Sequence, residues 1–102
     1  MSNGVVVQYV GFEPKALVRE YTFSVRGSGE EREFHLNIPN EAFISHRARY
    51  QDAPGICAVR LEAELAAHAN HPVETRYAIT VEEMENYRVA RLPKTGRKGP
   101  KT

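Results

Sequence analysis

The sequence predicts an α+β fold, in which a mainly antiparallel sheet is packed by a central helix and a C-terminal helix. Two runs of alternating apolar and polar residues flank a short glycine-containing loop, as in an antiparallel hairpin. A long helical segment, 52–69, follows this hairpin. A later strand and a second helix come after it, and helices over one face of a mainly antiparallel sheet are the α+β layout.

Three strands are expected in the first part of the chain, and they form a meander. Residues 5–12 are rich in β-branched and aromatic side chains, and Gly11 marks either a bulge or the strand end. Residues 19–26 and 32–38 alternate with a period of two, and 27–31 is expected to be the hairpin loop. The side chains expected to face the core are Tyr21, Phe23, Val25, Phe34, Leu36 and Ile38.

The central helix has clear start and stop signals. Asp52 is expected to act as N-cap through its carboxylate, and Pro54 fits only in the first turn. At the other end Asn70 is expected to adopt the left-handed conformation, and Pro72 prevents continuation.

This helix carries two apolar stripes, whereas a helix that rests on a sheet with its back in water needs one. The broad stripe consists of Cys57, Ala58, Leu61, Leu65 and Ala69. The narrow stripe consists of Ile56, Val59, Ala63 and Ala67. We expect the broad stripe to pack on the sheet and the narrow one to contact either the C-terminal helix or a partner chain. The alternative is that its alanines are simply tolerated on an exposed face.

Shorter elements complete the prediction. Residues 13–16 are expected to form a turn, and 40–44 a single helical turn capped by Asn40. A strand is expected over 73–80. Thr80 and Glu83 then have the spacing of a capping box, which begins a second helix that ends near residue 90.

Length and composition describe one ordinary domain, expected over residues 1–92. The chain has 102 residues, 41% hydrophobic and 26% charged, which is typical of a soluble globular protein. Its one cysteine cannot form an internal disulfide, which suits a reducing compartment. No segment has the features of a signal peptide or the length of a membrane span, so we expect a cytoplasmic protein with no membrane association.

Charge is distributed unevenly along the chain. Residues 1–87 carry 13 acidic and 8 basic side chains, whereas 88–102 carry 6 basic side chains and no acid. The basic residues of this C-terminal segment are Arg88, Arg91, Lys94, Arg97, Lys98 and Lys101. We expect 93–102 to be a disordered basic tail, since it contains nothing that can form a core. These six cations are candidates for contacts with phosphate groups.

Candidate sites for chemistry are few. Gly27-Ser28-Gly29 precedes a strand rather than a helix, so it is a hairpin turn and not a phosphate-binding loop. Cys57 lies on the broad apolar stripe and is expected to be a buried core residue. His68 and His71 are spaced for a shared metal ion but lack a third ligand, and no nucleophile motif is present. We therefore expect no metal, no cofactor and no catalytic residues.

The function expected from the sequence is association with another protein or with a second copy of the chain, through Ile56, Val59, Ala63 and Ala67. The alternative is a nucleic-acid-associated module that uses the basic tail. An enzyme would need a concave pocket that gathers His35, His46 or Cys57 with a carboxylate.

Overall fold

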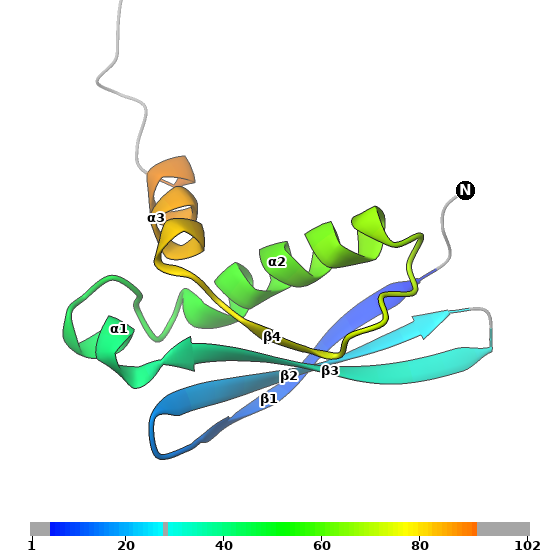
Figure 1. Ribbon diagram of the computed structural model, residues 1–102, viewed down its shortest axis with the longest axis horizontal. Helices are drawn as coiled ribbons and strands as arrows, with labels where there is room; N and C mark the ends of the chain where they lie inside the picture. Colours follow the sequence, from blue (N-terminus) through cyan, green and yellow to red (C-terminus); the bar gives the residue numbers. More distant parts are fainter. Residues whose placement is uncertain (1–4, 28, 92–102) are drawn as a thin grey trace, which may run out of the picture.

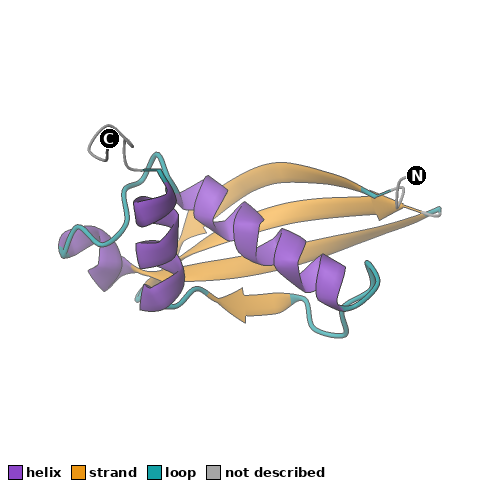
Figure 2. Cartoon of the chain, turned by 90° about the horizontal axis from the view of Figure 1, so that it is seen from above, coloured by secondary structure: helices purple, strands orange, loops and turns teal. Residues whose placement is uncertain are grey.

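The sheet has four strands, and two of the three helices lie over one of its faces (Figures 1 and 2). The computed structural model describes residues 5–27 and 29–91. The elements are, in chain order, β1 (Val6–Pro14), β2 (Val18–Gly27), β3 (Glu30–Pro39), α1 (Asn40–Ile44), α2 (Ala53–Ala67), β4 (Arg76–Ala78) and α3 (Val81–Ala90). This arrangement confirms the predicted α+β fold class.

The strand order is β1-β2-β3-β4. The first three strands form the expected antiparallel meander, and β2 pairs with β3 continuously from Val18↔Pro39 to Gly27↔Glu30. The bulge expected near Gly11 is present, because the register shifts between Tyr9 and Gly11. The fourth strand pairs with β3 in parallel and is only three residues long.

The core lies between the sheet and α2. The six side chains expected to point inward from β2 and β3 are all buried. From α2 the broad stripe contributes Cys57, Leu61 and Leu65, which are also buried, whereas Ala69 lies beyond the helix and is exposed. Met84 of α3 completes this core at one end.

The opposite face of the sheet carries a polar network instead of a helix. Glu20 is buried there, and its Oε2 accepts a hydrogen bond of 2.8 Å from Nη1 of Arg76. Thr22 Oγ1 lies 3.1 Å from Nδ1 of His35. Ser24, also buried, donates to Glu31 at 2.7 Å. Each of these buried polar groups has a partner, so the network is consistent with a structural role.

Both α1 and α2 end in a backbone motif that contains a non-glycine residue with positive φ. At the end of α2 the amide of Asn70 donates to the carbonyl of Leu65, and Ala69 and Asn70 have φ of 54° and 66°. At the end of α1 the amide of Arg47 donates to Ala42, and His46 has φ of 65°. These are Schellman motifs, in which glycine normally takes the left-handed position. The left-handed Asn70 confirms the sequence prediction.

Several expected boundaries and caps are wrong in detail. Asp52 precedes α2, but its backbone is helical (φ −90°, ψ −16°) and its side chain forms no capping hydrogen bond. Asn40 is the first residue of α1 and not its cap, since its Nδ2 donates to the carbonyls of Lys15 and Ala16 in the β1–β2 turn. The Thr80 cap is confirmed, because its hydroxyl accepts from the amide of Glu83 at 3.1 Å.

Candidate functional site

A groove with an apolar lining runs between α2 and α3. We define the α2/α3 groove by its lining residues, which are Ile56, Val59, Arg60, Ala63, Glu83, Asn86, Tyr87 and Ala90. Its volume is about 380 Å³. The residues from α2 recur at intervals of three and four, as do those from α3, so each helix turns one face toward the groove.

Arg60 holds the two helices together at the base of the groove. Its Nε donates to Glu64 Oε2 at 2.9 Å, and its Nη1 forms an ion pair with Glu83 of α3. The same nitrogen reaches the carbonyl of Ala78 in β4 at 3.3 Å. The polar groups at the base are therefore largely satisfied within the chain, and the open part of the groove is apolar.

The narrow stripe predicted as an interaction face is divided by the fold. Ile56 is buried where α3 crosses α2, so it belongs to the core. Val59, Ala63 and Ala67 are exposed, with Val59 at 57% of its full accessible area. The C-terminal helix thus covers only the first turn of the stripe, and the two residues Val59 and Ala63 remain as one wall of the groove.

Two acidic residues outside the groove lining are one helical turn from a groove residue. Glu62 lies three residues after Val59, and Glu82 lies four residues before Asn86, so each is a surface neighbour of a groove residue. Both side chains are exposed, and neither forms an ion pair with another residue in 5–27 or 29–91. An apolar surface with free carboxylates beside it is suited to a cationic amphipathic partner.

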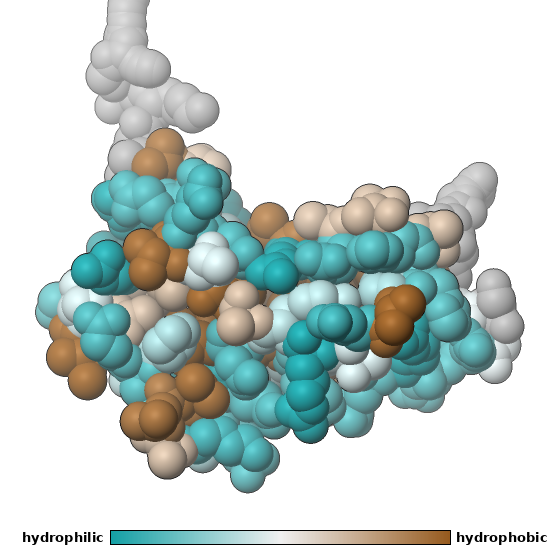
Figure 3. All heavy atoms as spheres, in the orientation of Figure 1, coloured by the Kyte–Doolittle hydropathy of each residue, from teal (hydrophilic) through white to brown (hydrophobic). Residues whose placement is uncertain are grey.

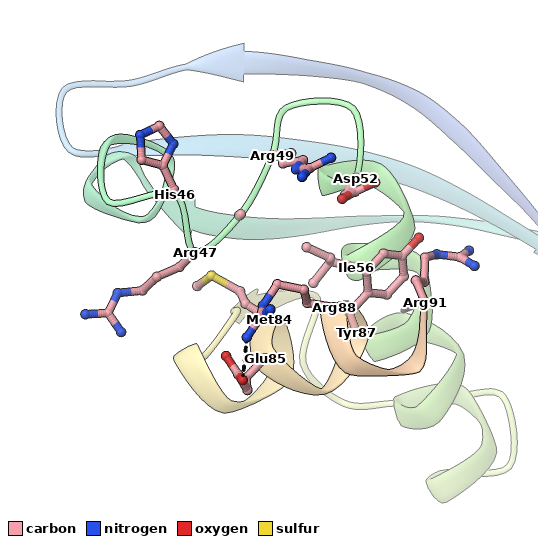
Figure 4. A pocket seen from close by; sticks show the side chains of 11 residues that line it. His46, Arg47, Arg49, Asp52, Ile56, Met84, Glu85, Tyr87, Arg88 and Arg91 are labelled. Carbon is pink, nitrogen blue, oxygen red and sulfur yellow. Dashed lines mark hydrogen bonds and ion pairs between the residues drawn. The ribbon is translucent and has the colours of Figure 1, made fainter. Parts of the chain in front are cut away.

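On the other side of α3 lies a wider cleft, which we call the arginine cleft. Its lining residues are His46, Arg47, Ala48, Arg49, Asp52, Ile56, Met84, Glu85, Tyr87, Arg88 and Arg91. The cleft has a volume of about 620 Å³ (Figure 4). Four arginines face two carboxylates in this lining, so positive charge predominates.

Two separate segments supply these arginines. Arg47 and Arg49 come from the connection between α1 and α2, which the Schellman motif after α1 turns toward α3. Arg88 and Arg91 come from the last turn of α3 and the residue that follows it. Arg88 also donates to Glu85 at 2.7 Å. Sequence reasoning selected Arg88 and Arg91 but missed the other two, since no local pattern distinguishes them from ordinary loop arginines.

The remaining candidate cations of the C-terminal segment, Lys94, Arg97, Lys98 and Lys101, lie outside the described residues. The same is true of the expected tail as a whole. Arg91, the last described residue, lines the arginine cleft.

The residues named as enzyme candidates lie in three different parts of the fold. On the sheet, His35 Nδ1 lies 3.1 Å from Thr22 Oγ1 and 3.8 Å from Glu20 Oε1. Cys57 is buried, as expected, and burial, with a further contribution from Glu83, raises the pKa of its thiol to about 12. His46 does share the arginine cleft with Asp52 and Glu85, but it forms no hydrogen bond or ion pair to them. His35 lies on the polar face of the sheet, away from the cleft.

His68 and His71 do not converge. His68 Nε2 lies 3.5 Å from Glu64, whereas His71 Nε2 lies 3.5 Å from Glu30 at the β2–β3 hairpin. Within residues 5–27 and 29–91 no three histidine, cysteine, aspartate or glutamate side chains are grouped so that they could hold a metal ion.

A third surface feature surrounds Arg19. Its guanidinium carbon lies 4.3 Å from the ring centroid of Phe12 and 4.5 Å from that of Tyr50, and Tyr50 stacks on Phe43 at 4.5 Å. The space-filling view shows hydrophobic surface at this end of the sheet, near the β1–β2 turn and α1 (Figure 3). These contacts join β1, β2 and the loop before α2, which is a sufficient structural role for them.

Comparison with known proteins gives no further identification. No protein-family model, no curated protein and no solved structure matches this chain. None of the helices in the described part of the chain is both long enough and apolar enough to cross a membrane.

Proposed function

We propose that this protein is a non-catalytic binding domain that associates with another protein through the α2/α3 groove. The observation that supports this proposal is the groove's exposed apolar lining between two helices, with Val59 and Ala63 on one wall and Tyr87 and Ala90 on the other. A contiguous apolar concavity on a protein surface is a feature of interaction sites. A groove between two helices is a common receptor for a third helix.

The occupant that we propose is an amphipathic helix with a narrow apolar stripe and flanking lysine or arginine residues. Alanines at residues 63 and 90 allow a helix backbone to approach closely. Glu62 and Glu82, each one helical turn from a groove residue, are exposed and form no ion pair with another described residue, so we propose them as partners of the flanking cations of such a helix. Charge complementarity of this kind favours a basic partner over a second copy, which would bring its own Glu62 and Glu82 to the interface.

The proposal can be tested with a fluorescent model peptide of about 18 residues, roughly five helical turns, built from leucine, alanine and lysine. Its anisotropy is measured as the full-length protein is added. We expect saturable binding that Val59→Glu weakens at least about tenfold, because a buried carboxylate would lose its hydration. Val73→Glu is the matched control, since Val73 is 89% exposed and lies outside the groove.

Three outcomes would contradict the proposal. The first is equal binding by the Val59→Glu and Val73→Glu variants, and the second is equal binding of a peptide in which glutamate replaces lysine. The third is concentration-dependent dimerisation in sedimentation equilibrium that Val59→Glu abolishes, because the occupant would then be a second copy. Both substitutions are at exposed residues, so thermal unfolding of each variant should remain close to that of the wild type.

A further inference from the structure

We propose that the arginine cleft binds the phosphate groups of a single-stranded nucleic acid. This site is distinct from the α2/α3 groove and lies on the other side of α3. It differs from the tail-based prediction because the folded domain itself supplies the main contacts. Arg47 and Arg49, which are more than 35 residues before Arg88 in the sequence, become part of the same surface.

The guanidinium groups are spread along the cleft instead of converging on one point. Figure 4 shows Arg47 at one end, Arg91 at the other beyond the ring of Tyr87, and Arg49 and Arg88 on opposite sides between them. A single phosphate ion would be best bound by cations that converge on it. A row of cations is suited to an extended polyanion whose phosphates repeat along a chain.

Two of these four cations, Arg47 and Arg49, form no ion pair with another described residue and so remain available to an external anion. The Arg47 side chain forms one hydrogen bond, from Nε to Ser45 Oγ at 3.3 Å, and the Arg49 guanidinium forms none with any other described residue. Arg91 lies over the ring of Tyr87, 4.7 Å from its centroid, and interacts favourably with the Tyr87 side chain and with Asp52. Arg88 forms an ion pair with Glu85.

The floor of the cleft favours a nucleic acid over other polyanions. Tyr87 is the partly exposed side chain of this floor, whereas Ile56 and Met84, which also lie between the two rows of polar residues, are buried in the core (Figure 4). A partly exposed aromatic side chain beside a cationic track can contact an unpaired base, which is the usual arrangement in single-strand binding. A flat membrane surface would not reach a concave floor, and a polysaccharide sulfate has no aromatic base to place there.

The proposed site consists of described residues only. The basic residues that follow Arg91 in the sequence, Lys94, Arg97, Lys98 and Lys101, lie outside them. The acidic character of residues 1–87, which argued against nucleic-acid binding from sequence alone, does not extend to this surface. In the folded chain, Arg47 and Arg49 are gathered beside α3.

The test is fluorescence anisotropy of a labelled mixed-sequence DNA strand of about 20 nucleotides, titrated with full-length protein at several salt concentrations. Each phosphate contact with single-stranded DNA contributes about 0.7 to the slope of log K against log salt. We expect Arg49→Gln to lower the slope by about 0.7 and the affinity severalfold. The matched control is Arg26→Gln, since Arg26 is an exposed arginine at the hairpin end of β2 whose side chain forms no hydrogen bond or ion pair with another described residue.

A second pair of variants separates the contribution of the arginine cleft to DNA binding from that of the C-terminal segment. With Lys94, Arg97, Lys98 and Lys101 all changed to glutamine, binding should weaken but persist at low salt. Adding Arg47→Gln and Arg49→Gln should then abolish it.

The proposal is overturned if Arg49→Gln and Arg26→Gln behave alike, or if the tail variant alone loses all binding. It is also overturned if a duplex of the same sequence binds more tightly than the single strand, or if phosphatidylserine vesicles bind in an Arg49-dependent way while the DNA strand does not.

Discussion

The hydroxyl group of Tyr87 in α3 lies directly against the backbone of Gly55 in the first turn of α2. A Cβ atom placed on Gly55 would overlap the hydroxyl oxygen and come within 3.0 Å of the ring carbon Cζ. Glycine within a helix costs roughly 0.5–1 kcal/mol relative to alanine. Its presence here is explained by the close approach of α3, which places Tyr87 between the α2/α3 groove and the arginine cleft.

Gly55→Ala should therefore fail to stabilise the protein, although alanine is the better helix former. The overlap with the Tyr87 hydroxyl should offset the gain in helix propensity of about 1 kcal/mol. In a Tyr87→Phe background the nearest atom is removed, and the same substitution should become more favourable by about 1 kcal/mol. Urea unfolding of the four proteins measures this coupling, and additive effects would contradict the packing relationship.

Arg60→Ala should destabilise the protein by about 2 kcal/mol, because it leaves Glu83 half-buried without its cationic partner. Glu83 already has one buried oxygen, Oε1, without a hydrogen bond among the described residues. Arg88→Ala is the control, since its pair with Glu85 is exposed and should contribute no more than about 0.5 kcal/mol. Both values come from denaturant unfolding, and equal losses would show that Arg60 does not connect the helices.

Ala69→Gly should stabilise the protein by about 1 kcal/mol. Ala69 has φ of 54°, a conformation that costs an L-residue roughly 1–2 kcal/mol and costs glycine little. Ala66→Gly, three residues earlier and inside α2, should have the opposite effect and destabilise by about 1 kcal/mol. The midpoints of thermal unfolding should therefore move in opposite directions, and a shift in the same direction would rule out the left-handed cap.

Alkaline pH should destabilise the fold through two buried groups. Burial raises the pKa of Cys57 from 9.0 to about 12 and that of Tyr21 from 10.0 to about 12. The folded protein therefore keeps protons that the unfolded chain releases. The stability due to this difference is complete below pH 9. It is lost as the pH rises from about 9 to about 12 for Cys57 and from about 10 to about 12 for Tyr21, by up to about 1.4 kcal/mol per pH unit for each group.

The variant Cys57→Ala isolates the contribution of the thiol. It should be less stable than the wild type at neutral pH because it leaves a cavity, but its free energy of unfolding should fall less steeply from pH 9. The measurement is urea unfolding at intervals of pH. Parallel curves for the two proteins would contradict a raised thiol pKa.

The sequence by itself determined the structural features that depend only on residues close together in the chain. The alternation in β2 and β3, the Thr80 cap and the left-handed Asn70 each depend on residues within a few positions of one another, and each is present in the structure. The α+β class follows from the order of these elements. The local prediction was wrong for Asn40. Its side chain does not cap α1 but forms hydrogen bonds with the β1–β2 turn, which is distant in the sequence.

Tertiary structure alone decided how the surfaces are composed. The two stripes of α2 were visible in the sequence, but the crossing point of α3 determines that Ile56 is buried and Val59 is exposed. Likewise, Arg47 and Arg49 meet Arg88 and Arg91 only because α1 ends in a Schellman turn and α3 returns across the start of α2. Such contacts join residues far apart in the chain, and no periodicity within one segment specifies them.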